Sequence, residues 1–411
     1  MAISRFPWRK IVDRLYRRDS TSVGLSRTPA RSGARLTQTA PSYVWVETTS
    51  DLEAAIARLR GALYVGVDTE ADSRHHYPEK TCLIQIGSGD EVFIVDPLAD
   101  VNVRLLGPLL ADPSVQTLFH GADFDLRGLN RDWGFEIHNV YDTNVSARFA
   151  GLERFGLAML IEDLFGKTLP KDQRLQRADW SRRPLSSEAL EYAAGDVIYL
   201  AELRDAIDHR LKELGRTAWV AEELLRLEQI RWAPPDPETA YLSVKGSSRL
   251  PDRALGVLKS LYEMREAEAR RIDRPTAFIV PSEAMIAIAA NPEVDLAEVK
   301  GLSPNLLRRL GPNIQRAIKS GLERGPIRRP PPQYPSRPRL TVEQEQRLKI
   351  LKDWRNNHAE DLKLDSSLLW PMRSFERLAR YPGCFDDELV FGDVRKWQND
   401  KFASTVRTLL Q

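Results

Sequence analysis

The sequence predicts an α/β domain with a mixed sheet, followed by two small all-helical domains. Apolar segments separated by turns come first, and strands then alternate with helices, which is the order expected of a sheet with both parallel and antiparallel neighbours. Past a polar, proline-bearing stretch at 232–237, the pattern becomes helical and repeats itself. At 411 residues the chain is long enough for two to three domains.

The first domain begins with one helix and a meander of three strands, each strand bounded by turn residues. These elements are expected at 51–60 for the helix and at 63–68 (LYVGVD), 82–86 (CLIQI) and 91–95 (EVFIV) for the strands. The pattern then alternates, with expected elements at 116–120 (strand), 123–133 (helix) and 139–141 (strand), before several helices.

The helical part contains an internal repeat with an offset of 90 residues. The shift aligns eight identical residues in 35 ungapped positions, including Arg265 with Arg355 and Pro281 with Pro371. Two copies of one helical unit are therefore expected. Between them, residues 325–339 contain six prolines and four arginines, a composition typical of an extended, semi-rigid linker.

Charge is strongly segregated along the chain. The formal charge is +7 for residues 1–41, −12 for 42–230 and +7 for 231–411. We interpret the acidic middle as a place for metal-binding carboxylates and the basic flanks as phosphate-attracting; a chance sorting of solvated charge is the competing interpretation. Residues 1–41 carry only two acids, Asp13 and Asp19, and their composition favours a disordered basic tail over a transit peptide.

Composition also excludes several classes of protein. No apolar run reaches the roughly 18 residues of a spanning helix, so no membrane association is expected. Cys82 and Cys384 cannot build a disulfide framework and fit a reducing cytoplasm, where we expect the protein. No G-x4-G-K-[ST] phosphate loop is present, which argues against a helicase and against a nucleotide cofactor.

A pair of acids lies at the end of the first expected strand. Side chains on a strand alternate between faces, so Asp68 and Glu70 project to one side while Val65 and Val67 project into the core. Two carboxylates this close repel each other unless a cation lies between them, and Mg²⁺ or Mn²⁺ prefers such oxygen ligands. Alone, Asp-x-Glu is weak and fits a surface pair as well.

A second group follows the strand at 116–120. Asp125 falls in the first turn of the next helix, directed toward the strand ends, and we interpret it as functional. Asp123 is the competing acid, and we interpret it as structural because it can cap the helix. His120 fits a structural hydrogen bond and a substrate contact equally well.

A third group lies on a helix that is expected to begin after Ser186 as its N-cap. Tyr192 and Asp196 are four residues apart and therefore share one helix face. Gly195 costs about 1 kcal/mol relative to alanine inside a helix, which suggests close approach of another group or a packing contact.

Together these motifs resemble the DEDDy exonucleases, in the order Asp-x-Glu, His-x4-Asp and Tyr-x3-Asp. Within this group the sequence resembles ribonuclease D and the exonuclease subunit of the nuclear exosome, and the resemblance covers about residues 42–411. It is carried by further segments at 83–86 (LIQI), 119–122 (FHGA), 142–143 (DT) and 178–185 (ADWSRRPL). The departures are the basic tail and Gly195, where the family usually has a small non-glycine residue.

The resemblance implies a ribonuclease H-like exonuclease fold and a 3′→5′ exoribonuclease that releases nucleoside 5′-monophosphates. Two divalent ions, Mg²⁺ or Mn²⁺, would be held by Asp68 as bridging ligand with Glu70, Asp125 and Asp196, and Tyr192 would orient the attacking water. The implied substrates are structured RNA precursors such as tRNA 3′ ends. The resemblance further implies that Gln85, His120 and Arg183 are candidate substrate-binding residues.

The expected domain boundaries follow from these assignments. They are a basic tail at 1–41, the exonuclease domain at 42–231, helical domains that look like the helicase-and-ribonuclease-D C-terminal (HRDC) domain at 246–325 and 340–411, and a Pro/Arg-rich linker at 326–339. Residues 300–339 contain ten Lys or Arg and one acid. This segment is a candidate nucleic-acid surface through Arg308, Arg309, Arg316 and Lys319, or else a solvated linker.

Two alternatives remain at this point. A DNA exonuclease shares the same fold and chemistry, and the helical repeats occur with both kinds of enzyme. A non-catalytic RNA-binding scaffold is disfavoured, because a decayed site would be expected to have lost at least one of the four acids or the tyrosine.

Overall fold

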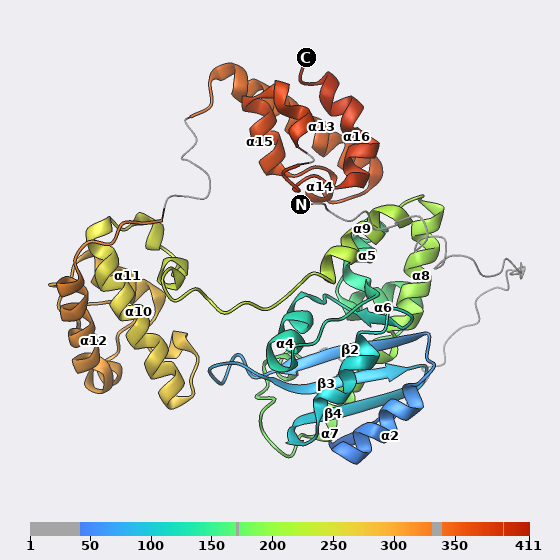
Figure 1. Ribbon diagram of the computed structural model, residues 1–411, viewed down its shortest axis with the longest axis horizontal. Coiled ribbons are helices and arrows are strands. Elements are labelled where there is room, and N and C mark those ends of the chain that lie inside the picture. The colour runs from blue at the N-terminus through green and yellow to red at the C-terminus, as the bar shows by residue number, and fades with distance from the viewer. Residues whose placement is uncertain (1–41, 170–171, 331–338, 389) are drawn as a thin grey trace, which may run out of the picture. The chain divides into compact units, whose positions relative to one another are not determined.

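The computed structural model describes residues 42–169, 172–330, 339–388 and 390–411 (Figure 1). The expected basic tail at 1–41 and residues 331–338 of the expected linker lie outside the described residues. Among the described helices, none has the length and apolar character needed to cross a membrane.

A six-stranded mixed sheet forms the centre of the first domain, with the order β1-β4-β3-β2-β5-β6. The strands β2, β3 and β4 form an antiparallel meander, whereas β1, β5 and β6 each pair in parallel with a neighbour. The strands are β1 (Val44–Thr48), β2 (Tyr64–Ala71), β3 (Thr81–Ser88), β4 (Glu91–Asp100), β5 (Gln116–Phe119) and β6 (Val140–Asp142). The mixed sheet predicted from the sequence is confirmed; β1 was not predicted as a strand.

Helices cover both faces of this sheet (Figure 1). On one face Val65 and Val67 are buried in a core with α2 (Thr49–Leu59) and α4 (Asp123–Trp133). On the other face Leu83 and Leu118 pack with α7 and the start of α8. The remaining helices of this domain are α3 (Gly107–Leu110), α5 (Thr143–Phe149), α6 (Leu157–Phe165), α7 (Ser187–Ile198), α8 (Leu200–Glu213) and α9 (Thr217–Leu227), with short 3-10 turns η1 (Val103–Leu106) and η2 (Leu175–Arg177).

The helix starts that matter for the site have identifiable causes. The Ser186 hydroxyl accepts a hydrogen bond from the Ala189 amide, so the expected N-cap of α7 is confirmed. The expectation that Asp123 caps α4 is wrong, because Ala122 occupies that position and makes no side-chain cap. Instead, the Asp142 carboxylate accepts hydrogen bonds from the Gly121 and Ala122 amides at 3.0 and 2.8 Å. A residue from β6 thus orders the turn before α4.

The two helical units repeat as their sequences predict. The first contains η3 (Ala240–Ser243), η4 (Ser247–Arg249), α10 (Asp252–Ile272), η5 (Thr276–Phe278), α11 (Ser282–Ala290) and α12 (Pro304–Arg324). The second contains α13 (Val342–Leu362), α14 (Ser366–Leu369), α15 (Met372–Arg380), η6 (Pro382–Asp387) and α16 (Lys396–Thr408). The bounds of α10 and α11 recur 90 residues later in α13 and α15. Asp273 and Lys363, which end α10 and α13 with φ of 51° and 50°, obey the same offset.

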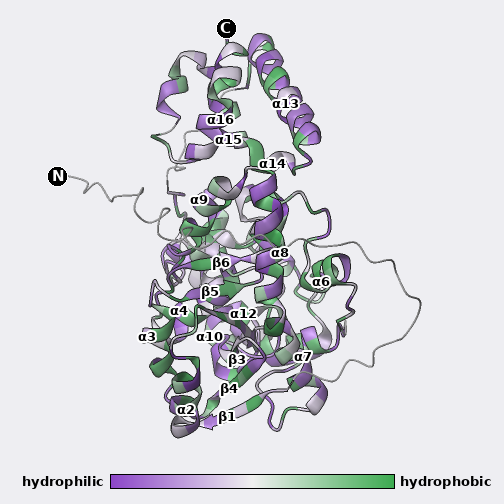
Figure 2. Cartoon of the chain, turned by 90° about the vertical axis from the view of Figure 1, so that its right-hand side faces the viewer, coloured by the Kyte–Doolittle hydropathy of each residue, from purple (hydrophilic) through white to green (hydrophobic). Residues whose placement is uncertain are grey.

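The cores of the two units differ. The first unit buries its apolar residues mainly against each other. The apolar residues of the second form one cluster with residues of α5, α8 and α9, in which Trp397 stacks on Trp219 with ring centroids 4.6 Å apart. Hydrophilic residues are prominent along α8 and α13 (Figure 2).

Two glycines allow α10 and α12 to pack closely in the first unit. A Cβ added at Gly321 would meet the Gly256 carbonyl oxygen at 2.8 Å and also the Val257 backbone, whereas a Cβ at Gly311 in the same helix would meet nothing within 4 Å. We expect Gly321→Ala to destabilise the protein by about 1–3 kcal/mol through overpacking. Gly311→Ala should stabilise it by about 0.5–1 kcal/mol through helix propensity.

Denaturant unfolding of the full chain, followed by circular dichroism, compares the two variants with the wild type. Shifts of the same sign and size would contradict the close contact of these helices.

Candidate active site

Three of the expected carboxylates come together where β2 ends. One carboxylate oxygen from each of Asp68, Glu70 and Asp196 lies within 4.8 Å of the others, and all three side chains are partly buried. Strand alternation places Asp68 and Glu70 on the face that α7 covers, and Asp196 descends from α7 to meet them. The arrangement therefore forms one oxygen-rich group that is still open to solvent.

Asp125 lies beside this group rather than within it. Its side chain is buried at the start of α4 and accepts a hydrogen bond from the Thr69 hydroxyl at 2.5 Å. Burial is the main reason that the pKa of Asp125 lies well above its usual range, and the charge of Asp68 adds to the effect. Asp125 is thus close enough to Asp68 for their charges to repel, although its oxygens are not among the three that lie within 4.8 Å of one another.

The electrostatics of the group favour a bound cation. Burial raises the pKa of Asp68 and of Glu70 well above their usual ranges, and repulsion from neighbouring acids raises both further. Burial also raises the pKa of Asp196 to about 7, although a hydrogen bond from Tyr192 lowers it. Divalent ions such as Mg²⁺ and Mn²⁺ prefer oxygen ligands. The residues therefore fit a divalent metal centre by donor type, spacing and charge.

Tyr192 lies one helical turn before Asp196, and its hydroxyl contributes a hydrogen bond that stabilises the ionised Asp196. Burial, followed by the charges of Asp196 and Glu70, raises the pKa of this phenol. The hydroxyl consequently stays protonated at neutral pH and can donate a hydrogen bond, but it cannot serve as a phenolate base. The Trp180 ring packs nearby, with its centroid 6.3 Å from that of Tyr192.

Gln85 stands opposite Asp68 in the β2–β3 register and is fully buried. Neither its amide nitrogen nor its amide oxygen has a hydrogen-bond partner among the described residues. The side chain lies beneath the site rather than on its surface, so direct contact with a substrate is not what this placement favours.

His120 lies at the end of β5 and has a defined tautomer. Its Nδ1 is 2.9 Å from the Thr143 hydroxyl, which itself donates to the Phe119 carbonyl. The hydroxyl therefore accepts from an Nδ1–H, and Nε2 of the neutral ring is left as an acceptor. Burial lowers the pKa of His120, which keeps the ring neutral.

Arg183 uses all five of its N–H donors within the protein. It forms a two-pronged ion pair with Asp96 at 2.6 Å and donates to the carbonyls of Cys82, Trp180 and Arg182. These contacts hold the segment that precedes α7 against the sheet. They favour a structural function for Arg183 over the substrate contact expected from the sequence.

Two further residues that support the site were not identified from the sequence. Thr69 faces away from Asp68 and Glu70 yet holds Asp125, and Gln176 forms a side-chain hydrogen bond with Tyr192. Of these two residues, only Thr69 could have been suspected from the sequence, because it lies between Asp68 and Glu70. The close approach inferred at Gly195 is not seen, because a Cβ there would meet only Leu169, at 4.0 Å.

The basic residues chosen as a nucleic-acid patch all lie exposed on α12. At about 100° per residue, Arg308, Arg309, Arg316 and Lys319 span roughly 100° of the helix circumference. The opposite side of α12 is buried through Leu310, Ile314, Ala317 and Gly321.

Comparison with known proteins gives consistent matches. A 3′-5′ exonuclease family matches residues 43–212, and the HRDC domain family matches residues 254–318. The ribonuclease D of Gluconacetobacter diazotrophicus is 36% identical over 270 residues, 64% of this chain and 67% of that protein. The ribonuclease D of Nitrobacter hamburgensis is 30% identical over 371 residues, 89% and 94% of the two chains.

Solved structures agree on the fold. Escherichia coli RNase D, described as an exoribonuclease involved in structured RNA processing, matches with a TM-score of 0.68 at 24% identity, over 90% of this chain and 99% of that one. The catalytic core of RRP6 from Trypanosoma brucei matches with a TM-score of 0.58 at 25% identity, over 70% of this chain and 84% of that one.

The raised pKa values predict how pH affects the metal-free protein. Because the folded state binds protons more tightly than the unfolded state, stability should fall as pH rises from the ordinary carboxyl range toward about 7, the pKa of Asp196. We expect Asp196→Asn to weaken this decline and to raise the melting temperature at about pH 8 in a chelator. Mg²⁺ or Mn²⁺ should stabilise the wild type more than the variant.

Thermal melting across pH, with chelator and with metal, measures both effects. Asp205→Asn, on the exposed side of α8, is the matched control and should behave like the wild type. A wild type whose stability rises steadily over this range would be inconsistent with the buried acidic group.

Proposed function

The chain belongs to the ribonuclease D family of 3′→5′ exoribonucleases, and we propose that Asp68, Glu70, Asp125, Asp196 and Tyr192 carry out its metal-dependent hydrolysis of RNA. The observation that supports this most strongly is the group of three carboxylate oxygens within 4.8 Å of one another. Its members come from two elements far apart in the sequence, and they belong to the Asp-x-Glu and Tyr-x3-Asp motifs.

Two divalent ions are the proposed cofactors, and Asp68, Glu70, Asp125 and Asp196 are the residues that would hold them. When bound, such ions act as Lewis acids and make a coordinated water nucleophilic near neutral pH. The protein holds the ligands in place: strand β2 fixes two, helix α7 the third, and Thr69 fixes the carboxylate of Asp125 through its hydroxyl.

Tyr192 is proposed to orient the attacking water. Its protonated hydroxyl donates a hydrogen bond to Asp196, which holds the hydroxyl beside one of the proposed metal ligands. The acceptor nitrogen of His120 can receive a hydrogen bond from the substrate, while Gln85 and Arg183 are assigned to supporting the site from beneath and from the side.

The proposed substrates are RNAs with single-stranded 3′ ends on a structured body, tRNA precursors among them, and the products are nucleoside 5′-monophosphates. We assign residues 42–231 to the exonuclease domain and residues 246–325 and 340–411 to HRDC-like domains joined by residues 326–339. The exposed basic face of α12 is proposed to hold the RNA backbone. The two free cysteines suit a cytoplasmic enzyme.

The activity is tested with a 5′-labelled tRNA that carries a 3′ extension, incubated with purified protein and Mg²⁺. The expected products form a ladder of one-nucleotide steps. Asp68→Asn should abolish metal-dependent hydrolysis, whereas Tyr192→Phe should retain RNA binding and lose at least about 100-fold in kcat, because only orientation of the water is removed.

The same RNA with its label at the 3′ end distinguishes the reaction class, because exonucleolysis releases the label as a mononucleotide. Internal fragments, or near-normal hydrolysis by Asp68→Asn after chelator treatment and Mg²⁺ resupply, would refute the assignment.

The basic face of α12 is tested by changing its residues Arg308, Arg309, Arg316 and Lys319 to glutamine. Weaker RNA binding is expected. The slope of the logarithm of the binding constant against the logarithm of the salt concentration should also become less negative, by up to about 0.7 for each phosphate that is no longer neutralised. Dissociation constants measured over a range of NaCl concentrations provide both quantities.

A matched control replaces four exposed basic residues of the second helical unit, Lys349, Lys352, Arg373 and Lys401. If both quadruple variants bind alike, the effect is one of net charge. An unchanged salt slope in the α12 variant would remove that helix from the RNA surface.

A further inference from the structure

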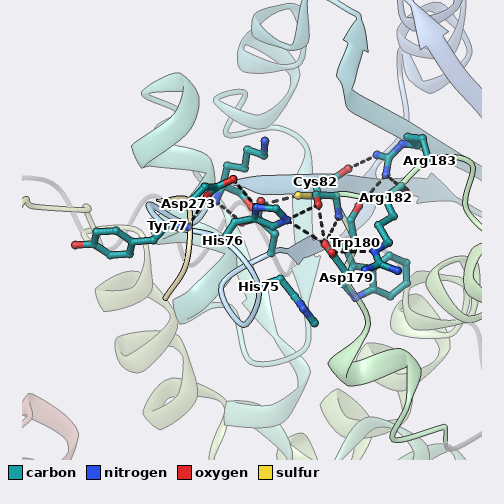
Figure 3. A network of polar contacts seen from close by, with 12 residues as sticks. His75, His76, Tyr77, Cys82, Asp179, Trp180, Arg182, Arg183 and Asp273 are labelled. Atoms are coloured by element: carbon teal, nitrogen blue, oxygen red, sulfur yellow. Dashed lines mark hydrogen bonds and ion pairs between the residues drawn. The ribbon is translucent and has the colours of Figure 1, made fainter. Parts of the chain in front are cut away.

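A polar network joins the first helical unit to the segment that precedes α7 (Figure 3). His76, in the β2–β3 connection, lies at its centre. Its Nδ1 is 2.7 Å from an Asp273 carboxylate oxygen, at the end of α10. Its Nε2 is 2.9 Å from the Ser181 hydroxyl and 3.4 Å from an Asp179 oxygen. One imidazole therefore bridges two parts of the chain that are almost 100 residues apart in sequence.

The direction of each hydrogen bond determines the charge of this ring. Asp273 also accepts the Tyr77 amide, and that bond and His76 hold the pKa of Asp273 below its usual range. The Ser181 hydroxyl donates its only hydrogen to Asp179 at 2.6 Å, so its oxygen must accept from His76. An ionised carboxylate also only accepts. Both ring nitrogens of His76 are thus donors, and a ring with two N–H groups is an imidazolium.

The charged groups around His76 fit this assignment. Burial raises the pKa of Asp179, but hydrogen bonds from Ser181 outweigh it and leave the pKa below its usual range. The neighbouring His75 does not take part in this bridge, because its Nε2 contacts the Arg177 carbonyl oxygen. Other titratable groups on the packed elements include Asp72, Lys80, Arg182, Glu266 and Arg270.

The segment that His76 holds contacts Tyr192. Trp180, between Asp179 and Ser181, is almost completely buried, and its ring packs near the Tyr192 ring. Gln176, a few residues earlier, hydrogen-bonds the Tyr192 hydroxyl. A movement of this segment would therefore alter the orientation of the phenol directly.

We propose that His76 is a positioning residue of the exonuclease, whose protonated imidazole ties Asp273 of the first helical unit to the Asp179–Ser181 segment that seats Tyr192. The inference rests on the proposed function of Tyr192. RNA held by the helical unit is thereby linked to the orientation of the hydroxyl at the reacting centre. The link requires one hydrogen bond from each ring nitrogen of His76, and a ring with a single N–H can donate only one of the two.

The test compares His76→Gln with the wild type in RNA hydrolysis between about pH 6 and 8.5, the range in which histidine ordinarily loses its charge. Glutamine offers donors on one atom only, so it cannot bridge two acceptors on opposite sides. We expect kcat of the variant to be about 3- to 10-fold below that of the wild type near pH 6, with KM little changed, and the ratio to approach one at high pH.

His209→Gln is the matched control, because His209 is exposed on α8 and, among the described residues, forms an ion pair with Glu213 alone; its ratio to the wild type should be close to one throughout. Asp273→Asn keeps a residue type that tolerates the positive φ of this position, and it should show the same pH pattern as His76→Gln. Because the two changes break one bridge, the double variant should lose no more than either single variant.

A second measurement is independent of activity. In ¹⁵N-histidine-labelled protein, the His76 signals, assigned by their absence in His76→Gln, should show both ring nitrogens protonated in the pH range where His76→Gln lowers kcat. A neutral tautomer there, a flat kcat ratio or additive losses would overturn the inference while leaving an active exonuclease. If the wild type itself fails to shorten RNA, the proposed function falls, and this inference falls with it.

Discussion

Repulsion among carboxylates held close together with limited access to water governs the architecture around the site. Asp68, Glu70 and Asp196 are drawn within 4.8 Å of one another, and burial raises the pKa of each. No fold gathers such groups without cost, because each ionised acid loses hydration and lies beside a like-charged neighbour. A divalent cation reverses the sign of that interaction, so the same arrangement that destabilises the metal-free site selects for metal.

The surrounding structure keeps this unfavourable group in place. Strand β2 fixes the spacing of two acids, and its buried valines anchor it in the core on the opposite face. The Asp142 carboxylate orders the turn before α4, which carries Asp125, and Arg183 pins the segment before α7 to Asp96. Beneath the acids, by contrast, neither polar atom of the buried Gln85 side chain has a hydrogen-bond partner among the described residues.

Much of this could be predicted from the sequence because the controlling features are local. Alternation along β2 separates Val65 and Val67 from Asp68 and Glu70, the four-residue spacing places Tyr192 beside Asp196, and Ser186 marks the start of α7. Strand β1 was not predicted because Val46 is its only buried residue, so its sequence has no alternation of buried and exposed side chains.

The other differences arise from contacts between distant residues. Asp123 has the residue type of a helix cap, but Asp142 orders that turn from 20 residues away. Arg183 lies in a motif next to the site, yet its partner Asp96 is 87 residues away in the sequence. Likewise, Trp397 of the second helical unit stacks on Trp219 of α9. Local patterns contain no information about such pairings, so the Asp96 partner of Arg183 could not be predicted from the sequence.

The proposed chemistry requires these acids to form a binding site for divalent metal ions. Crystals grown with Mn²⁺ and measured at the manganese absorption edge provide the clearest test, since anomalous scattering locates the ion without reference to any assumed mechanism. We expect a strong peak bounded by Asp68, Glu70 and Asp196, with a second on the side of Asp125. A well-ordered site with no anomalous signal between these carboxylates at millimolar Mn²⁺ would show that they do not hold metal.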